Sequence, residues 1–165
     1  MSFLVALELI LAMEGGPSDD PRDPGGYTRH GISQTSHPDV NVGELSVSGA
    51  ADIYRRQYWD RCKCDSLPGG IALLIFDSAV NLGPNWASRQ LQRSLGVKTD
   101  GIIGPITIDA AIYSDRHDVI FRYTVDRLVR YASLETWGAY SRGWTRRAMF
   151  TMLLALELEK GDQQT

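Results

Sequence analysis

The chain alternates between apolar stretches of helical length and short breaks rich in glycine and proline, which predicts a mostly helical protein. Phe3–Met13 is almost wholly apolar and is followed by Glu14 and Gly15-Gly16, where glycine can end a helix. Ile71–Leu82 is apolar on nearly every side, so we expect it to be the most buried helix. Further helices are expected over Ala50–Cys62, Asn85–Leu95, Pro105–Tyr113, Val119–Leu134 and from near Thr145 to Glu159.

Two details of these helices follow from the residue types. Ser48 is the expected N-cap of the helix at Ala50–Cys62, because a serine oxygen can accept from the free amides of a helix start. The apolar spacing in Val119–Leu134 predicts an inner stripe. Its members are Phe121, Val125, Leu128, Val129 and Ala132.

The segment between the first helix and residue 33 carries the chemistry. Asp23 precedes Pro24, which favours an extended backbone, and Gly25-Gly26 permits a tight turn. Tyr27–His30 then reads as a short strand closed by Gly31. Such a hairpin would fold Asp23 and Thr28 back toward Glu14.

Glu14 is expected at the carboxyl end of a helix, where acidic residues are usually unfavourable. A carboxylate at the carboxyl end of a helix faces the negative end of the dipole, which raises its pKa, as does the apolar neighbour Met13. A carboxylic acid that keeps its proton near neutral pH is suited to general acid catalysis. With Asp23 as a second carboxylate and Thr28 to help hold a water, the arrangement is typical of glycoside hydrolysis.

Other roles are open for these acidic residues. Asp23 can be an ordinary turn residue, and Asp19 and Asp20 compete with it as the second carboxylate. A calcium loop starting at Asp19 is excluded, because His30 occupies the position of the closing glutamate. His30 itself is expected to be a solvated strand residue.

The pattern E-G-G-x(3)-D-P-x-D-x-G-G-x-T-x-x-G-I-S over residues 14–33 resembles glycoside hydrolase family 108, the lysozyme-like N-acetylmuramidases common among phage endolysins. The spacing Glu14…Asp23…Thr28 is also similar to the triad of phage-type lysozymes, with one residue fewer before the threonine. The resemblance implies a lysozyme-like α+β fold, a small β-hairpin with a helical body. It also implies cleavage of the β-1,4 bond between N-acetylmuramic acid and N-acetylglucosamine, with Glu14 as general acid and no metal or organic cofactor.

Candidate substrate-binding residues lie further along the chain. Asp77 and Asn81 sit one turn apart on the apolar helix, where polar groups need partners. They either hold the core by an internal hydrogen bond or face the sugar, as the family pattern F-D-x-A-V-N-x-G favours. Aromatic rings suit the apolar faces of sugars, and Trp137, Tyr140 and Trp144 cluster near a G-W-x-x-R string similar to one in the family. Core packing is the alternative role for at least one of these tryptophans.

Residues 81–111 carry a second resemblance. Their L-Q…L-G…D-G…G-P-x-T string is similar to the predicted peptidoglycan-binding segment that accompanies family 108 domains. The alternative is two helices joined by a glycine turn and packed on the catalytic part. We therefore expect a catalytic region at residues 1–80 and a helical region at residues 81–165, packed as one globular unit.

Composition limits the possible partners. The 165 residues carry a net charge of −3, which gives no global attraction to nucleic acid or to an anionic membrane. Cys62 and Cys64 are expected to be reduced thiols, and no zinc-ligand spacing accompanies them. We expect a monomer whose partner is bacterial peptidoglycan.

The location of the protein is inferred from the first helix. Phe3–Met13 lacks a basic start, is interrupted by Glu8 and is too short to span a bilayer, so it reads as a core helix. We expect synthesis in the cytoplasm without a signal peptide, no stable membrane insertion, and action on the wall in the periplasm after release. Two other functions stay open, a lytic transglycosylase and a peptidoglycan-binding module without catalysis.

Overall fold

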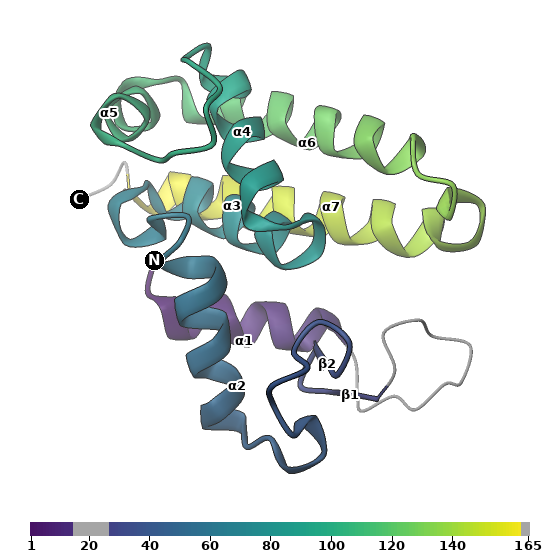
Figure 1. Ribbon diagram of the computed structural model, residues 1–165. Helices are drawn as coiled ribbons and strands as arrows, with labels where there is room; N and C mark the ends of the chain where they lie inside the picture. The colour runs from purple at the N-terminus through teal and green to yellow at the C-terminus, as the bar shows by residue number, and fades with distance from the viewer. Residues whose placement is uncertain (15–26, 163–165) are drawn as a thin grey trace. The chain divides into compact units, whose positions relative to one another are not determined.

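The computed structural model describes residues 1–14 and 27–162 and divides the chain into two compact units, residues 2–57 and residue 58 onward (Figure 1). Most of the described residues are helical, and two short strands form an antiparallel pair, as the sequence predicts. The first unit holds α1 (Phe3–Glu14), β1 (Thr28–Arg29), β2 (Ile32–Ser33), the 3₁₀ turn η1 (Val42–Glu44) and α2 (Val47–Tyr54). The second holds η3 (Cys64–Ser66), α3 (Gly69–Leu82), α4 (Pro84–Leu95), α5 (Pro105–Tyr113), α6 (Arg116–Ala132) and α7 (Trp137–Asp162).

Helix α1 ends at Glu14, as the following glycines predict. One side of the helix is buried at the i, i+3, i+4, i+7 spacing of a single helical face. The buried side chains are Phe3, Ala6, Leu7 and Ile10. The residue proposed as the acid therefore terminates a helix that is held by its apolar side.

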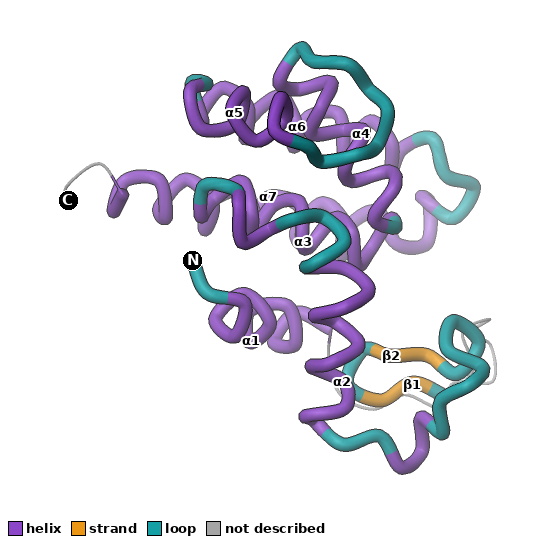
Figure 2. The backbone as a smooth tube through the Cα atoms, turned by 60° about the vertical axis from the view of Figure 1, so that its left-hand side comes forward, coloured by secondary structure: helices purple, strands orange, loops and turns teal. Residues whose placement is uncertain are grey.

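The hairpin turns at a different place from the one expected. Thr28 pairs with Ser33 and Arg29 with Ile32 (Figure 2), so the partner of β1 follows it in the chain. The turn is His30-Gly31, with φ of 52° and 74°. A two-residue hairpin turn of this kind requires positive φ at both positions, which glycine tolerates and histidine rarely adopts. The prediction of His30 as a strand residue is thus wrong, and Gly25-Gly26 lies outside the described residues.

The loop after the hairpin is held by one side chain. The Gln34 amide donates to the carbonyls of His37 (3.1 Å) and Val40 (2.7 Å), and its oxygen accepts from the Val42 N–H (3.3 Å). The Tyr54 hydroxyl donates to the His30 carbonyl (3.1 Å). The hairpin turn and its following loop are thereby fixed to one another and to α2.

Helix α2 begins and ends earlier than expected. Its N-cap is Ser46, which accepts from the Gly49 N–H at 3.0 Å, so the assignment of this role to Ser48 is wrong. The α-helical geometry stops at Tyr54, and a π-helical turn, η2 (Arg55–Trp59), follows. The single helix expected over Ala50–Cys62 spans this change of geometry.

Helix α3 is the centre of the second unit and packs against α4, α6 and α7. Every residue from Gly69 to Ala79 is buried, which confirms that this is the most buried helix. A Cβ added at Gly70 would lie 2.3 Å from the carbonyl oxygen of Ala155 on α7, so only glycine permits this approach. The buried Glu159 carboxylate accepts from the Gly70 N–H (2.6 Å) and pairs with Arg116 (2.8 Å).

Helix α7 is longer than predicted, because it starts at Trp137 and not near Thr145. Gly138 and Gly143 lie inside it, although glycine weakens an isolated helix. Helices α6 and α7 lie side by side along their length (Figure 1), and that packing outweighs the low propensity of the two glycines.

The buried side of α6 is not the predicted stripe. Phe121, Val125 and Val129 are 59%, 42% and 64% exposed. The buried residues are instead largely polar or aromatic: Val119, Ile120, Tyr123, Thr124, Arg127 and Tyr131. A hydrophobicity pattern counts tyrosine and arginine as outer residues, whereas here they face a buried carboxylate on α3.

Both cysteines are free and buried, in agreement with the reduced thiols expected. Burial raises the pKa of Cys62 to about 11, so this thiol stays protonated. Within residues 1–14 and 27–162, no helix combines the length and the apolar character needed to cross a bilayer.

Candidate functional site

The proposed catalytic residues fall at the edge of what the structure describes. Glu14 is the last residue of α1, where the final carbonyls of a helix lack intrahelical partners and carry partial negative charge. Its side chain, and the whole of Asp19, Asp20 and Asp23, lie outside the described residues. Thr28 is the first residue of β1 and is partly buried. The backbone thus places Glu14 at the helix end predicted for it.

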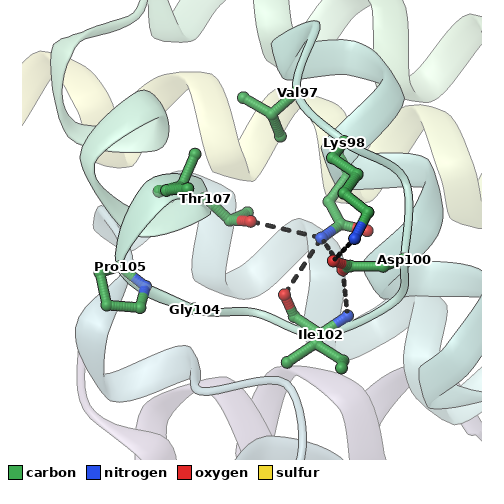
Figure 3. A pocket seen from close by; sticks show the side chains of 9 residues that line it. Val97, Lys98, Asp100, Ile102, Gly104, Pro105 and Thr107 are labelled. Carbon is green, nitrogen blue, oxygen red and sulfur yellow. Dashed lines mark hydrogen bonds and ion pairs between the residues drawn. The ribbon is translucent and has the colours of Figure 1, made fainter.

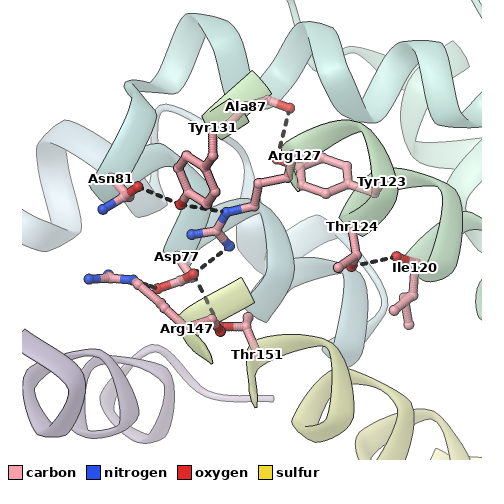
Figure 4. A network of polar contacts seen from close by, with 10 residues as sticks. All are labelled: Asp77, Asn81, Ala87, Ile120, Tyr123, Thr124, Arg127, Tyr131, Arg147 and Thr151. Atoms are coloured by element: carbon pink, nitrogen blue, oxygen red, sulfur yellow. Dashed lines mark hydrogen bonds and ion pairs between the residues drawn. The ribbon is translucent and has the colours of Figure 1, made fainter. Parts of the chain in front are cut away.

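Asp77 lies in a buried charge network in the second unit (Figure 4). Its carboxylate pairs with Arg127 of α6 at 2.6 Å, and both side chains have no exposed surface. From α7, Arg147 donates to it at 2.8 Å and the Thr151 hydroxyl at 3.1 Å. Both carboxylate oxygens are bonded within the network and are not accessible to solvent, so Asp77 does not contact a sugar. Of its two predicted roles, the one that fits is the internal bond that holds the core.

The network keeps its charges despite its burial. Burial by itself would raise the pKa of Asp77, but the neighbouring Arg127 and Arg147 outweigh it, and the pKa is lowered. Burial would likewise lower the pKa of Arg127, and the Asp77 charge overcomes this and raises it. Arg127 was not among the residues predicted from the sequence, although a carboxylate on an apolar helix implies a buried cation to balance it.

Asn81 stands one turn beyond Asp77 and is partly exposed. Its side-chain oxygen accepts from the Tyr131 hydroxyl at 2.5 Å, and that hydroxyl accepts from the Arg127 Nε at 2.9 Å. The predicted pair Asp77 and Asn81 is therefore joined through two residues of α6. Of the two, Asn81 is the one with access to solvent.

The three aromatic residues predicted to bind sugar do gather in space. Trp144 stacks on Tyr140, with ring centroids 5.5 Å apart, and on Tyr131 at 5.0 Å. Trp137 is tilted against Trp144 at 6.5 Å. Tyr140 is 54% exposed, whereas Trp137 and Trp144 are half-buried. Trp144 thus contacts three other rings, and Tyr140 is the ring most open to a ligand.

The L-Q…D-G…G-P-x-T string builds a loop around one buried amide. The Gln92 side chain donates to Asp100 (2.8 Å), the Ile102 carbonyl (3.1 Å) and Thr107 (3.3 Å), and accepts from the Gly101 N–H (2.7 Å). The Ile102 N–H and the Gln92 amide together lower the pKa of Asp100. These bonds lie beside a pocket of about 260 Å³ (Figure 3). The polar residues of the string therefore hold the loop.

Replacing Gln92 by alanine should destabilise the protein by about 2–4 kcal/mol, because a side chain bonded to four groups is lost from a buried position. Thermal or denaturant unfolding measures the change. Lys98→Ala is the matched control on the same loop, since the Lys98 side chain is exposed and pairs with Asp100 at 3.6 Å. It should shift stability by at most about 0.5 kcal/mol. Equal effects of the two variants would contradict the structural role of Gln92.

Two family models match the chain. Glycosyl hydrolase 108 matches residues 7–83, which include most of α1, the hairpin and α3. The solved structure of SagA from Brucella abortus is 33% identical, with a TM-score of 0.88 over 94% of each chain. This chain belongs to the glycosyl hydrolase 108 family.

The second model, described as Predicted Peptidoglycan domain, matches residues 86–149 of this glycosyl hydrolase 108 protein. That range contains the Gln92 loop and the aromatic cluster. No curated protein matches the sequence. The matches and the fold together confirm the family and the mostly α, lysozyme-like architecture expected from residues 14–33.

The two matched ranges and the two compact units divide this family 108 chain differently. The matches meet between residues 83 and 86, whereas the units meet between residues 57 and 58. Helix α3 belongs to the glycosyl hydrolase match but packs against α4, α6 and α7. The expected division at residues 80 and 81 stays a prediction.

Proposed function

We propose that this protein is an N-acetylmuramidase that hydrolyses the β-1,4 bond between N-acetylmuramic acid and N-acetylglucosamine in peptidoglycan. Glu14 acts as the general acid and donates its proton to the leaving glycosidic oxygen. The observation that carries the proposal is the end of α1 at Glu14 in a chain of the glycosyl hydrolase 108 family.

The position of Glu14 supports the protonated state that an acid needs. The carbonyl groups of the last turn of α1 carry partial negative charge, which disfavours a second negative charge on the adjacent carboxylate. A carboxyl group that keeps its proton to higher pH is then available for transfer to the sugar oxygen.

Asp23, assisted by Thr28, orients the water in this proposal. If a water attacks from the opposite face of the sugar, the two carboxyl groups stand about 6.5–9.5 Å apart and the anomeric centre is inverted. Thr28 is partly buried at the start of β1, and the His30-Gly31 turn fixes that strand against β2. No metal or organic cofactor enters this scheme.

Residues 86–149 hold the enzyme on its polymeric substrate in this proposal, in keeping with the description of the matched domain. The substrate lies in the wall, so the protein acts there after release from the cell interior. The two free buried thiols fit synthesis in a reducing compartment.

Digestion of purified peptidoglycan tests the reaction directly. We expect new reducing ends at N-acetylmuramic acid, because a muramidase hydrolyses the bond that joins C1 of this sugar to the next one. Mass spectrometry of the released sugars after borohydride reduction identifies the end. A 1,6-anhydro end would assign the chain as a lytic transglycosylase instead.

The same digest separates catalysis from binding. Sedimentation of the protein with peptidoglycan, without any released sugar, would support a wall-binding module and contradict the muramidase. Released sugars whose new end is N-acetylglucosamine would move the cleaved bond to the other linkage of the glycan.

A further inference from the structure

A chain of three hydrogen-bonding groups leads from the buried network to the surface. Arg127 can only donate, so its Nε–H makes the Tyr131 oxygen an acceptor. The single proton of that hydroxyl then needs an acceptor of its own, and the Asn81 oxygen lies 2.5 Å away. The direction of each bond is therefore set by the buried arginine.

This direction decides which end of the Asn81 amide is presented outward. With its oxygen bound to Tyr131, the amide nitrogen points away from the network (Figure 4). No residue in the described part of the chain accepts a hydrogen bond from this nitrogen, and Asn81 is partly exposed. Two N–H donors thus stand ready at the surface for an acceptor from outside.

Tyr131 is held in place on its other sides as well. Arg127 lies 5.3 Å from the centre of its ring, and Trp144 stacks on the ring. Burial raises the pKa of Tyr131 against the effect of Arg127, so the hydroxyl keeps the proton that it donates. A row of rings continues through Trp144 to the exposed Tyr140. The donor pair is therefore linked, through Tyr131 and Trp144, to an exposed aromatic ring of the kind that packs against sugars.

We propose that Asn81 recognises the acetamido carbonyl oxygen of an N-acetylated sugar, and that Arg127 and Tyr131 are positioning residues that fix the orientation of its amide. The inference rests on the proposed function for its substrate class. The group recognised on the sugar is a carbonyl oxygen. A sugar with a hydroxyl in place of the acetamido group should therefore bind more weakly. A peptide carbonyl of the wall has the same chemistry, and the exposed ring of Tyr140 favours the sugar.

The test is binding of neutral trisaccharides to full-length ¹⁵N-labelled protein carrying Glu14→Gln, which leaves the ligand intact. Tri-N-acetylchitotriose carries acetamido groups, and cellotriose carries hydroxyls in their place. We expect the side-chain NH₂ signals of Asn81 to shift with chitotriose, and chitotriose to bind roughly tenfold more tightly than cellotriose. The dipeptide alanyl-isoglutamine, from the wall peptide, should leave these signals unchanged.

Three variants, each added to this background, separate recognition from folding. Asn81→Asp keeps the shape and removes the donors, so the preference for chitotriose should disappear. Tyr131→Phe keeps the stacked ring and frees the amide to rotate, so the preference should fall about three- to tenfold. Tyr123→Phe is the matched control on the same helix, because the Tyr123 hydroxyl is buried and donates to the Ala87 carbonyl at 3.4 Å. It should keep the full preference.

Several results would overturn the inference. Equal binding of the two trisaccharides to the parent protein, or an unchanged preference in Asn81→Asp, would exclude recognition of the acetamido group. If the preference for chitotriose were lost in Asn81→Asp but kept in folded Tyr131→Phe, Tyr131 would not be a positioning residue. If the side-chain NH₂ signals of Asn81 shifted with the dipeptide and not with chitotriose, Asn81 would bind the peptide of the wall and not the sugar. None of these readouts requires catalysis, so they are independent of whether peptidoglycan is hydrolysed.

Discussion

Purified protein carrying Glu14→Gln is expected to fold normally and to lose lysis of peptidoglycan by about 10²- to 10⁴-fold. Glutamine has nearly the same shape as glutamic acid but has no acidic proton to give to the leaving oxygen. The substitution removes a negative charge from the last residue of α1, where a helix dipole disfavours negative charge, so stability should not fall. The clearing rate of a peptidoglycan suspension and the unfolding temperature measure the two effects.

Glu8→Gln is the matched control, since it makes the same change on an exposed residue of the same helix. It should clear peptidoglycan at the parent rate. Asp23→Asn should slow lysis less than Glu14→Gln does, because water retains some reactivity without a base. Near-normal clearing by Glu14→Gln would end the muramidase mechanism, and an unchanged rate in Asp23→Asn would move the second role to Asp20 or to no carboxylate.

The largest expected effect on stability is that of Asp77→Asn, about 3–5 kcal/mol. The substitution leaves Arg127 fully buried without a full opposite charge, and it also removes the charge that Arg147 pairs with on Asp77. Typical domains are stable by only about 5–15 kcal/mol, so the variant is expected to unfold at much lower denaturant concentration. Urea titration followed by tryptophan fluorescence measures the change.

Asp118→Asn provides the control, because Asp118 makes an exposed ion pair with Arg122 one turn along α6. It should cost at most about 1 kcal/mol. If Asp77→Asn were no more damaging than Asp118→Asn, Arg127 would have to reach water by a local rearrangement, and the network would not hold the second unit together.

The pH dependence of the Asp77 effect follows from its lowered pKa. The pKa of an aspartate in the unfolded chain is about 3.9, and the pKa of the folded Asp77 is lower than its ordinary value. The stability from Asp77 is therefore fully present above the unfolded pKa and is lost as the pH falls through the folded one. The difference between the parent and Asp77→Asn should be constant near neutral pH and shrink only in acid.

Sequence patterns were most successful where a single helix face or a local break decides the structure. The end of α1 at Glu14 follows from the two glycines after it, and the burial of α3 follows from its apolar residues on all sides. Two helix starts were predicted wrongly. Ser46 caps α2 in place of Ser48, and α7 starts at Trp137 because its packing against α6 outweighs the low helix propensity of Gly138 and Gly143.

The sequence was least informative where a residue has different roles according to its partner. Asp77 and Asn81 form a polar pair one turn apart, and the sequence gives no reason to treat them differently. In the structure, Arg127 and Arg147 pair with Asp77 inside the protein, whereas Tyr131 donates to the partly exposed Asn81. Arg127 lies 50 positions beyond Asp77, which is too far for any local pattern to join them.

By itself, the amino-acid sequence determined the family, the mostly helical architecture and the place of Glu14 at the end of a helix, because each of these depends on residues close together in the chain. Tertiary structure alone decided that α6 turns tyrosine and arginine inward and leaves Phe121 and Val129 exposed. A buried carboxylate must be balanced by a buried cation, and only the packing of α6 and α7 against α3 determines which arginines supply it.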